Sequence, residues 1–153
     1  MMTARCPAIV VAGTGSGVGK TSVTIALVAS LAKRGLNVQT FKTGPDFLDP
    51  TYLSLASGRP CYNLDGWMTG EAYVHALFSR ATAGADVAII EGAMGLFDGA
   101  DPASSEGSTA EIARRLSVPV LLVIDAGGQA RSAAATVKGF TEFEEGMNVA
   151  GVI

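Results

Sequence analysis

One glycine-rich segment near the N-terminus constrains the fold of this chain more than any other feature. Residues 13–21 have the sequence GTGSGVGKT, between an apolar run at 8–12 and a periodic apolar run at 23–31. The order strand, glycine loop and helix is the context in which a phosphate-binding loop forms. The strict pattern has its first glycine at position 14, whereas this chain has Gly13 one residue earlier and Thr14 in its place.

The parts of this loop have separate roles in binding a polyphosphate. Glycines let successive backbone N–H groups turn toward one ligand without Cβ clashes, and the following helix adds the partial positive charge of its N-terminus. We expect Lys20 to reach the β- and γ-phosphates of ATP and the Thr21 hydroxyl to ligate Mg²⁺. The residues expected to surround the phosphates are Gly15, Ser16, Gly17, Val18, Gly19, Lys20 and Thr21.

Apolar segments with strand character alternate with helical segments along the chain. This alternation predicts an α/β fold with a parallel sheet and helices on both faces, in which ligands gather at the carboxyl ends of the strands. We interpret 58–69 as irregular and 91–107 as a long glycine-rich loop. The expected strands are 8–12, 38–43, 86–90, 118–124 and one from about 148, and the expected helices are 20–34, 49–56, 70–83, 108–116 and 132–145.

Charged residues follow the expected strands at the edge where a ligand would bind. A carboxylate at Asp46 could hold Mg²⁺ or orient the γ-phosphate, and Glu91 ends a strand where nucleotide hydrolases place an acid on the metal. Lys42 would neutralise charge during phosphoryl transfer, although a lysine at the protein surface fits the pattern equally well. Two further acids have a structural alternative, since Asp49 precedes a proline as a helix cap would and Asp98 fits a simple turn.

Composition argues against several other classes of function. The net charge is −3 and the chain has no run of basic residues, so we expect no nucleic-acid partner. No apolar run reaches membrane-spanning length and no signal peptide precedes the first strand, which predicts a cytoplasmic protein without a membrane partner. The one histidine, His75, lies on an expected helix away from the glycine loops, so no catalytic triad can be assembled around it.

Two segments beyond the glycine loop carry a family resemblance. Residues 41–50 have the sequence FKTGPDFLDP and residues 91–99 have the sequence EGAMGLFDG. With these segments the chain resembles, over nearly its whole length, the N-terminal synthetase domain of the cobyrinic and hydrogenobyrinic acid a,c-diamide synthases. The glycine loop alone is also similar to that of dethiobiotin synthetase. The resemblance implies a P-loop NTPase of the dethiobiotin-synthetase/MinD-like type.

The resemblance implies an ATP-dependent ligase of cobalamin biosynthesis. ATP would phosphorylate the a and c acetate carboxylates of a corrin, cobyrinic or hydrogenobyrinic acid, and ammonia from glutamine would then displace each phosphate. By position, the family places Lys20 and Thr21 on the triphosphate and Mg²⁺, and Asp46 and Glu91 in the metal and phosphate shell. The region that governs the substrate corresponds to Leu48, Asp49 and Asp98.

The apolar run at 149–153 resembles an incomplete strand, so we expect residues 1–153 to be a truncated synthetase domain. A C-terminal glutaminase domain and part of the adenine pocket would then follow Ile153, and the resemblance leaves room for a homodimer. Three alternatives stay open: a ligase like dethiobiotin synthetase, a MinD/ParA-like switch ATPase, and a plain nucleotide-binding regulatory module. The switch ATPases carry a signature lysine where this chain has Gly15, which counts against that alternative.

Overall fold

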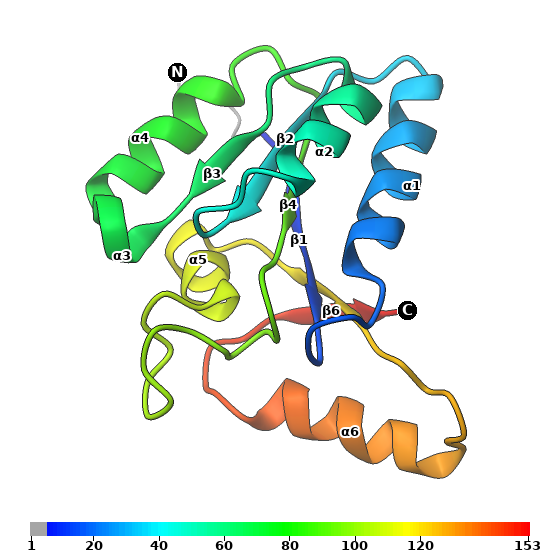
Figure 1. The fold of residues 1–153 in the computed structure, drawn as a ribbon. Helices are drawn as coiled ribbons and strands as arrows, with labels where there is room; N and C mark the ends of the chain where they lie inside the picture. The colour runs from blue at the N-terminus through cyan, green and yellow to red at the C-terminus, as the bar shows by residue number, and fades with distance from the viewer. Residues whose placement is uncertain (1–5) are drawn as a thin grey trace.

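Six parallel strands form the centre of the molecule, in the order β3-β2-β4-β1-β5-β6 (Figure 1). The computed structural model describes residues 6–153. Its strands are β1 (Ala8–Gly13), β2 (Val38–Thr43), β3 (Tyr62–Leu64), β4 (Val87–Glu91), β5 (Val120–Val123) and β6 (Val149–Val152). Its helices are α1 (Lys20–Lys33), α2 (Asp49–Ser57), α3 (Gly66–Thr69), α4 (Glu71–Ala81), α5 (Thr109–Leu116) and α6 (Arg131–Glu142). The predicted α/β fold with a parallel sheet is confirmed.

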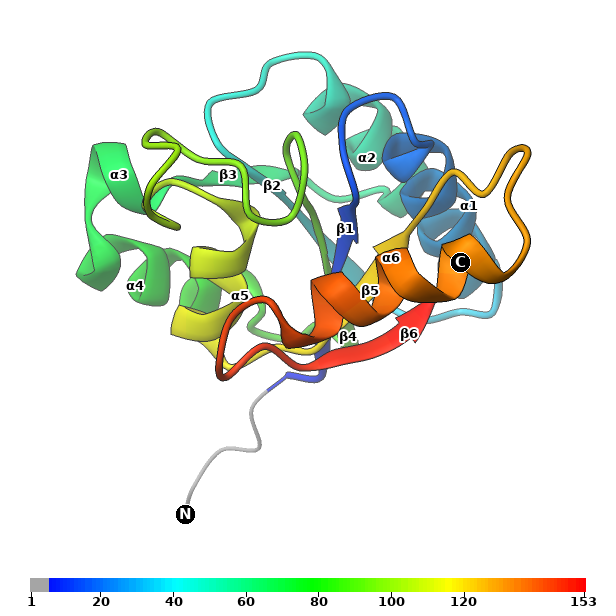
Figure 2. The same ribbon diagram turned by 90° about the horizontal axis from the view of Figure 1, so that it is seen from below.

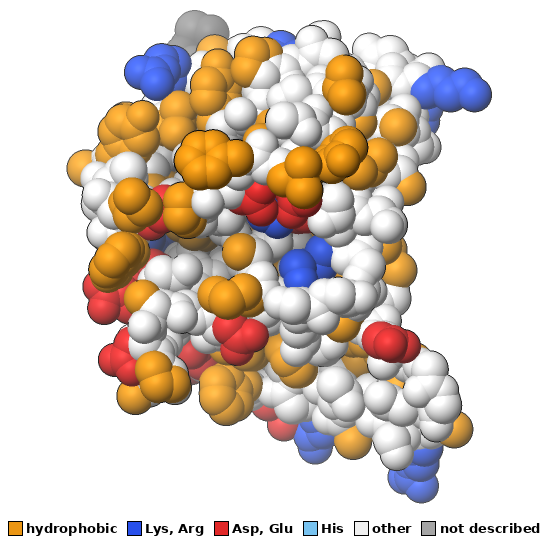
Figure 3. All heavy atoms as spheres, viewed as in Figure 1, with side chains coloured by type: hydrophobic (Ala, Val, Ile, Leu, Met, Phe, Trp, Pro, Cys, Tyr) orange, Lys and Arg blue, Asp and Glu red, His pale blue; other side chains and the backbone are white. Residues whose placement is uncertain are grey.

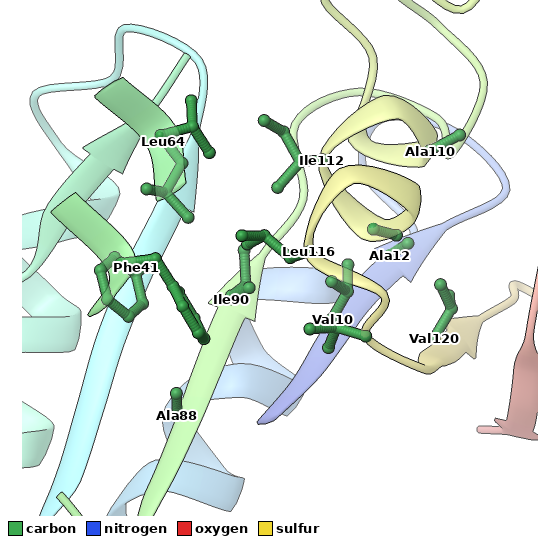
Figure 4. Packing of buried hydrophobic residues seen from close by; sticks show 14 of the residues in the cluster. Val10, Ala12, Phe41, Leu64, Ala88, Ile90, Ala110, Ile112, Leu116 and Val120 are labelled. Atoms are coloured by element: carbon green, nitrogen blue, oxygen red, sulfur yellow. The ribbon is translucent and has the colours of Figure 1, made fainter. Parts of the chain in front are cut away.

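The sheet is buried on both faces because side chains alternate along each strand. In β1, Val10 belongs to a hydrophobic core that also contains Leu116 of α5 and Phe78 of α4. Val11, the next residue, belongs to a second core with Val28 of α1. Figure 4 shows the first core from close by, and Figure 2 shows helices on the two sides of the sheet. Helices therefore cover both faces, as the alternation of apolar segments predicts.

Two helix ends follow the sequence signals closely. Helix α1 ends at Lys33, two residues before Gly35. The φ of Gly35, 85°, lets its own N–H reach the carbonyl of Ala32 and lets the N–H of Leu36 reach the carbonyl of Leu31. Helix α5 begins after Ser108, whose hydroxyl accepts a hydrogen bond from the N–H of Glu111 at 3.1 Å. The end of α1 therefore precedes the start of β2, and the start of α5 follows the carboxyl end of β4.

The prediction that 58–69 is irregular is wrong. This segment contains β3, which pairs with β2 at the edge of the sheet, and the one-turn helix α3. A three-residue strand shows too little alternation to be recognised, and only its pairing with β2 makes it a strand. Asp65 caps α3 by accepting a hydrogen bond from the N–H of Met68. Within residues 6–153, no helix combines the length and the apolar character needed to cross a membrane.

Candidate functional site

The carboxyl ends of three neighbouring strands bring the candidate residues together. The strands β2, β4 and β1 are adjacent in the sheet, and the loops that follow them come from segments far apart in the chain. The glycine loop follows β1, the acidic loop at 44–48 follows β2, and Glu91 is the last residue of β4. The register places Lys42 opposite Glu91. This is the edge at which parallel α/β sheets bind ligands.

The glycine loop has the open backbone that a phosphate needs. Gly17 and Gly19 have φ values of 78° and 99°, a region that favours glycine, and Gly19 precedes α1 without a side-chain cap. The N–H groups at this helix start therefore face outward toward a ligand. The side chain of Lys20 folds over the loop and donates a hydrogen bond to the carbonyl of Gly15 at 2.7 Å. Burial and the neighbouring Lys42 lower the pKa of Lys20.

Glu91 accepts hydrogen bonds from both sides of the site. Its Oε1 lies 2.6 Å from the Thr21 hydroxyl of the glycine loop and 3.0 Å from Nζ of Lys42 on β2. The residue is completely buried, and burial raises the pKa of its carboxyl against the opposing effect of Thr21 and Lys42. The other oxygen, Oε2, is buried without a hydrogen-bond partner among the residues that the structure describes. A buried, unpaired carboxylate oxygen beside a threonine hydroxyl has the chemistry of a ligand for a hard cation.

Lys42 lies inside the protein and not at its surface. Its residue is 3% exposed, and its Nζ donates to Asp49 Oδ2 at 2.7 Å and to the carbonyl of Gly92 at 3.1 Å, besides Glu91. Burial alone would lower the pKa of Lys42, but the hydrogen bond to Asp49 and the charge of Glu91 outweigh it and raise the pKa. The same contacts with Lys42 outweigh burial at Asp49 and lower the pKa of that carboxyl. The ammonium group is therefore held charged at the centre of the site.

Asp46 of the acidic loop and Asp49 at the start of α2 have different roles. Asp46 Oδ1 accepts hydrogen bonds from the N–H groups of Leu48 and Asp49, at 2.8 and 3.1 Å, and so organises the start of α2. The alternative that Asp49 caps this helix is wrong, because Asp49 is the first helical residue and its carboxylate binds Lys42. The second oxygen of Asp46 lies 3.8 Å from Nζ of Lys42. Leu48 is exposed beside them.

The loop after β4 is folded around Asp98. Its Oδ2 accepts a hydrogen bond from the N–H of Gly95 at 2.9 Å, as an aspartate in a turn does. A Cβ atom at Gly95 would lie 2.5 Å from that oxygen, so a side chain at position 95 would displace the carboxylate of Asp98. The N–H of Leu96 donates to the carbonyl of Gly13, which ties this loop to the glycine loop. Asp98 and Thr14 both line a cavity of about 450 Å³ on this side of the site.

Two threonines that the sequence analysis did not single out position the segment after Glu91. Thr43 and Thr109 are both buried, with their hydroxyl oxygens 3.2 Å apart. The N–H of Ala93 donates to each of them, at 2.7 and 3.1 Å. In the sequence, the position of Thr43 at the end of a predicted strand, beside Lys42, is the feature that could have identified it as a residue of the site. These contacts hold the carbonyl of Gly92 where it accepts from Lys42.

The carboxyl ends of neighbouring strands carry the candidate residues, and comparisons with known proteins show the family of the domain. The model of the CobQ/CobB/MinD/ParA nucleotide binding domain family matches residues 9–153. The chain belongs to this family. Membership makes the loop at 13–21 part of a nucleotide-binding domain, and the predicted P-loop fold is confirmed.

Several curated relatives are named for one reaction. The chain is 68% identical over 97% of its length to the cobyrinate a,c-diamide synthase of Syntrophotalea carbinolica, and covers 32% of that protein. It is 51% identical over 95% of its length to the hydrogenobyrinate a,c-diamide synthase of Rhodobacter capsulatus, and covers 34% of it. These relatives confirm the resemblance found in the segments 41–50 and 91–99. The chain spans about a third of the length of the curated relatives it matches.

The solved structures share the fold at lower identity. The signal recognition particle receptor FtsY from Elizabethkingia anophelis superposes with a TM-score of 0.66 and 24% identity, over 98% of this chain and 50% of that chain. The chloroplast FtsY from Physcomitrella patens gives a TM-score of 0.63 and 19% identity, over 98% of this chain and 50% of that chain. At this identity the likeness shows the fold alone.

Proposed function

We propose that the protein containing this chain phosphorylates the a and c acetate carboxylates of a corrin with ATP and prepares them for amidation. The observation that carries the proposal is that two buried lysines lie near each other at the carboxyl ends of the strands. Lys20 comes from the glycine loop and Lys42 from β2, and Glu91 accepts from Lys42 and Thr21 between them. Relatives named cobyrinate or hydrogenobyrinate a,c-diamide synthase supply the substrate class.

The arrangement suits the transfer of a phosphoryl group between two anions. A carboxylate oxygen of the substrate attacks the γ-phosphorus, the bond to the β–γ bridging oxygen breaks, and ADP leaves with that electron pair. Negative charge accumulates between substrate and nucleotide, where the ammonium groups of Lys20 and Lys42 offset it. The backbone N–H groups of the glycine loop hold the phosphates in line, so the protein contributes mainly alignment and charge.

Amidation follows without a further nucleotide. Ammonia attacks the carbonyl carbon of the acyl phosphate, phosphate leaves with the electrons of the C–O bond, and the nitrogen loses a proton to give the carboxamide. We assign the supply of ammonia to a glutaminase domain in the part of the protein that lies outside this chain. The two amidations use the same site in succession.

The residues present fit a Mg²⁺ ion bound with the nucleotide. Thr21 and the unpaired Oε2 of Glu91 would hold it, with the second oxygen of Asp46 nearby. Within residues 6–153 no group of three acidic, histidine or cysteine side chains forms a metal cage. That agrees with Mg²⁺, which binds through one or two protein ligands and the phosphates. When bound, Mg²⁺ would polarise the transferring phosphoryl group.

The test uses the intact protein with ATP, Mg²⁺, free ammonia and, in separate reactions, cobyrinic and hydrogenobyrinic acid. We expect ADP and the diamide to form with at least one corrin acid, and Lys20→Ala to abolish both products. Absence of ADP with either acid would overturn the proposal. ADP formation with a small diamine and bicarbonate in place of the corrin would favour the alternative of a ligase like dethiobiotin synthetase.

A further inference from the structure

A groove lies beside the acidic loop, on the side away from the glycine loop. It has a volume of about 560 Å³ and is bordered by the loop after β2, strand β3 and the helices α3 and α4. It is distinct from the cavity beside Asp98, which opens toward α6. Asp46 lines the groove, and its Oδ2 also lies 3.8 Å from Nζ of Lys42, so the groove borders the proposed phosphoryl-transfer site.

Large apolar and aromatic side chains line this groove while remaining exposed. Phe47 is 88% exposed and Met68 is 63% exposed, and Tyr62 and Tyr73 are partly exposed beside them. Figure 3 shows hydrophobic side chains gathered around a central group of acidic and basic side chains. Exposed apolar side chains collected in a concave surface next to a reactive centre are typical of a ligand site. A flat, largely apolar ring would bury them.

The charges in the groove favour an anionic ligand at one position. Asp65 and Asp46 line it, but each is engaged with backbone N–H groups: Asp65 with Met68, and Asp46 with Leu48 and Asp49. Arg80, near the end of α4, also lines it. Among the described residues Arg80 forms no ion pair and no side-chain hydrogen bond. It is the cation available to bind a carboxylate, and a guanidinium binds carboxylates through two parallel hydrogen bonds.

The position of the acidic loop relative to this groove is fixed. Asn63 of β3 donates a hydrogen bond from its amide to the carbonyl of Asp46 at 2.8 Å. Strand β3 therefore couples the floor of the groove to the loop that borders Lys42.

We infer that this groove binds one face of the corrin macrocycle, with Tyr73 against the ring and Arg80 on a peripheral carboxylate that is not reacting. The inference rests on the proposed function and assigns the substrate surface of that same site. It makes Arg80 a specificity-determining residue, because a ring that lacks the ionised side chain loses this contact.

The test measures kinetics and binding with the intact protein. Arg80→Ala should raise the KM for the corrin acid about tenfold and leave the KM for ATP unchanged, since the lost contact is a charge-assisted hydrogen bond to substrate alone. Arg80→Lys should restore part of the loss, because it keeps the charge but not the paired geometry. Tyr73→Ala should raise the same KM several-fold, whereas Tyr73→Phe should not. Equilibrium dialysis of the corrin, followed by its visible absorbance, should show the same order of affinities.

Arg34→Ala is the matched control, because Arg34 is an exposed arginine at the opposite end of α1. It should change neither KM. A normal corrin KM in Arg80→Ala, or a fall in kcat alone, overturns the assignment of the groove while the proposed function stands. A wild-type protein that binds no corrin acid in dialysis overturns both. A corrin KM that rises equally in Arg34→Ala also overturns the groove, since the effect would then come from net charge.

Discussion

Nζ of Lys42 lies 3.0 Å from Oε1 of Glu91, and neither side chain has meaningful contact with solvent. The pair joins the ends of β2 and β4, which are neighbours in the sheet and come from distant parts of the chain. Asp49 adds a second carboxylate to the same ammonium group. The centre of the site is thus also a buried ion cluster, and its members affect both stability and chemistry.

Lys42→Met should therefore destabilise the protein. It leaves the carboxylate of Glu91 buried without its cation, and breaking a buried pair in this way costs about 3 kcal/mol in the free energy of unfolding. The double variant Lys42→Met/Glu91→Gln should recover part of that loss, because the fully buried carboxylate is then neutral and only Asp49, which is partly exposed, lacks its cation. Urea denaturation of the four proteins of this cycle measures the coupling. Additive effects of the two substitutions would show that the pair is not energetically coupled.

Glu91→Gln should abolish turnover without unfolding the protein. The amide keeps the size of the side chain and can still accept from Thr21, but it removes the negative oxygen proposed to hold Mg²⁺. We expect kcat to fall at least about a hundredfold, the size of effect seen when one stabilising group is removed from a transition state. Far-UV circular dichroism should be unchanged. Glu142→Gln, on the exposed side of α6, is the control, and near-normal turnover in Glu91→Gln would exclude Glu91 from the mechanism.

The sequence predicted which residues lie at this site better than it predicted which of them contact one another. The glycine loop and the strand ends could be placed because each has a local signature, in glycine spacing or in a change from apolar to charged residues. The burial of Lys42 could not be predicted, because it depends on β4 lying beside β2 in the sheet. The contact of Asp49 with Lys42 depends instead on how the loop between β2 and α2 turns back, and a proline at position 50 fits a helix cap equally well. Local patterns locate residues, but the order of strands decides which of them meet.

Cys61 allows a test of the environment in the groove that we assign to the corrin. Burial raises the pKa of its thiol to about 11, from an ordinary value of 9.0. At pH 8 the folded protein should therefore contain about a hundredfold less Cys61 thiolate than an ordinary cysteine would, and alkylation should be slower to match. The rate should rise with pH until about 11.

The measurement uses the Cys6→Ser variant, in which Cys61 is the remaining cysteine. Iodoacetamide labelling is followed by mass spectrometry over a series of pH values, in the folded protein and in urea. The unfolded chain should react with an inflection near the ordinary pKa. The same inflection in folded and unfolded protein would mean that Cys61 is not shielded from solvent.

The first glycine of the loop lies where the side chain of Lys20, the lysine that we propose binds the phosphates, passes. A Cβ atom at Gly13 would lie 2.6 Å from Cγ2 of Val18 and 3.0 Å from Cγ and Cδ of Lys20. At Gly15, two residues on, a Cβ atom would meet no atom within 4 Å. A side chain at position 13 would therefore collide with Val18 and Lys20, which explains why this loop has its first glycine there. Position 14 can hold a threonine because the close approach occurs one residue earlier.

Gly13→Ala should displace Lys20 and Val18 and cost about 2 kcal/mol in the free energy of unfolding, as overpacking of a tight site does. It should also weaken ADP binding, because the ammonium group of Lys20 can no longer reach the phosphates from its present path. Gly15→Ala is the matched control and should change the stability by less than about 0.5 kcal/mol. Urea denaturation and calorimetric titration with ADP measure the two effects. Equal stabilities for the two variants would show that the loop shifts to accept a side chain at Gly13, and that its glycine is dispensable.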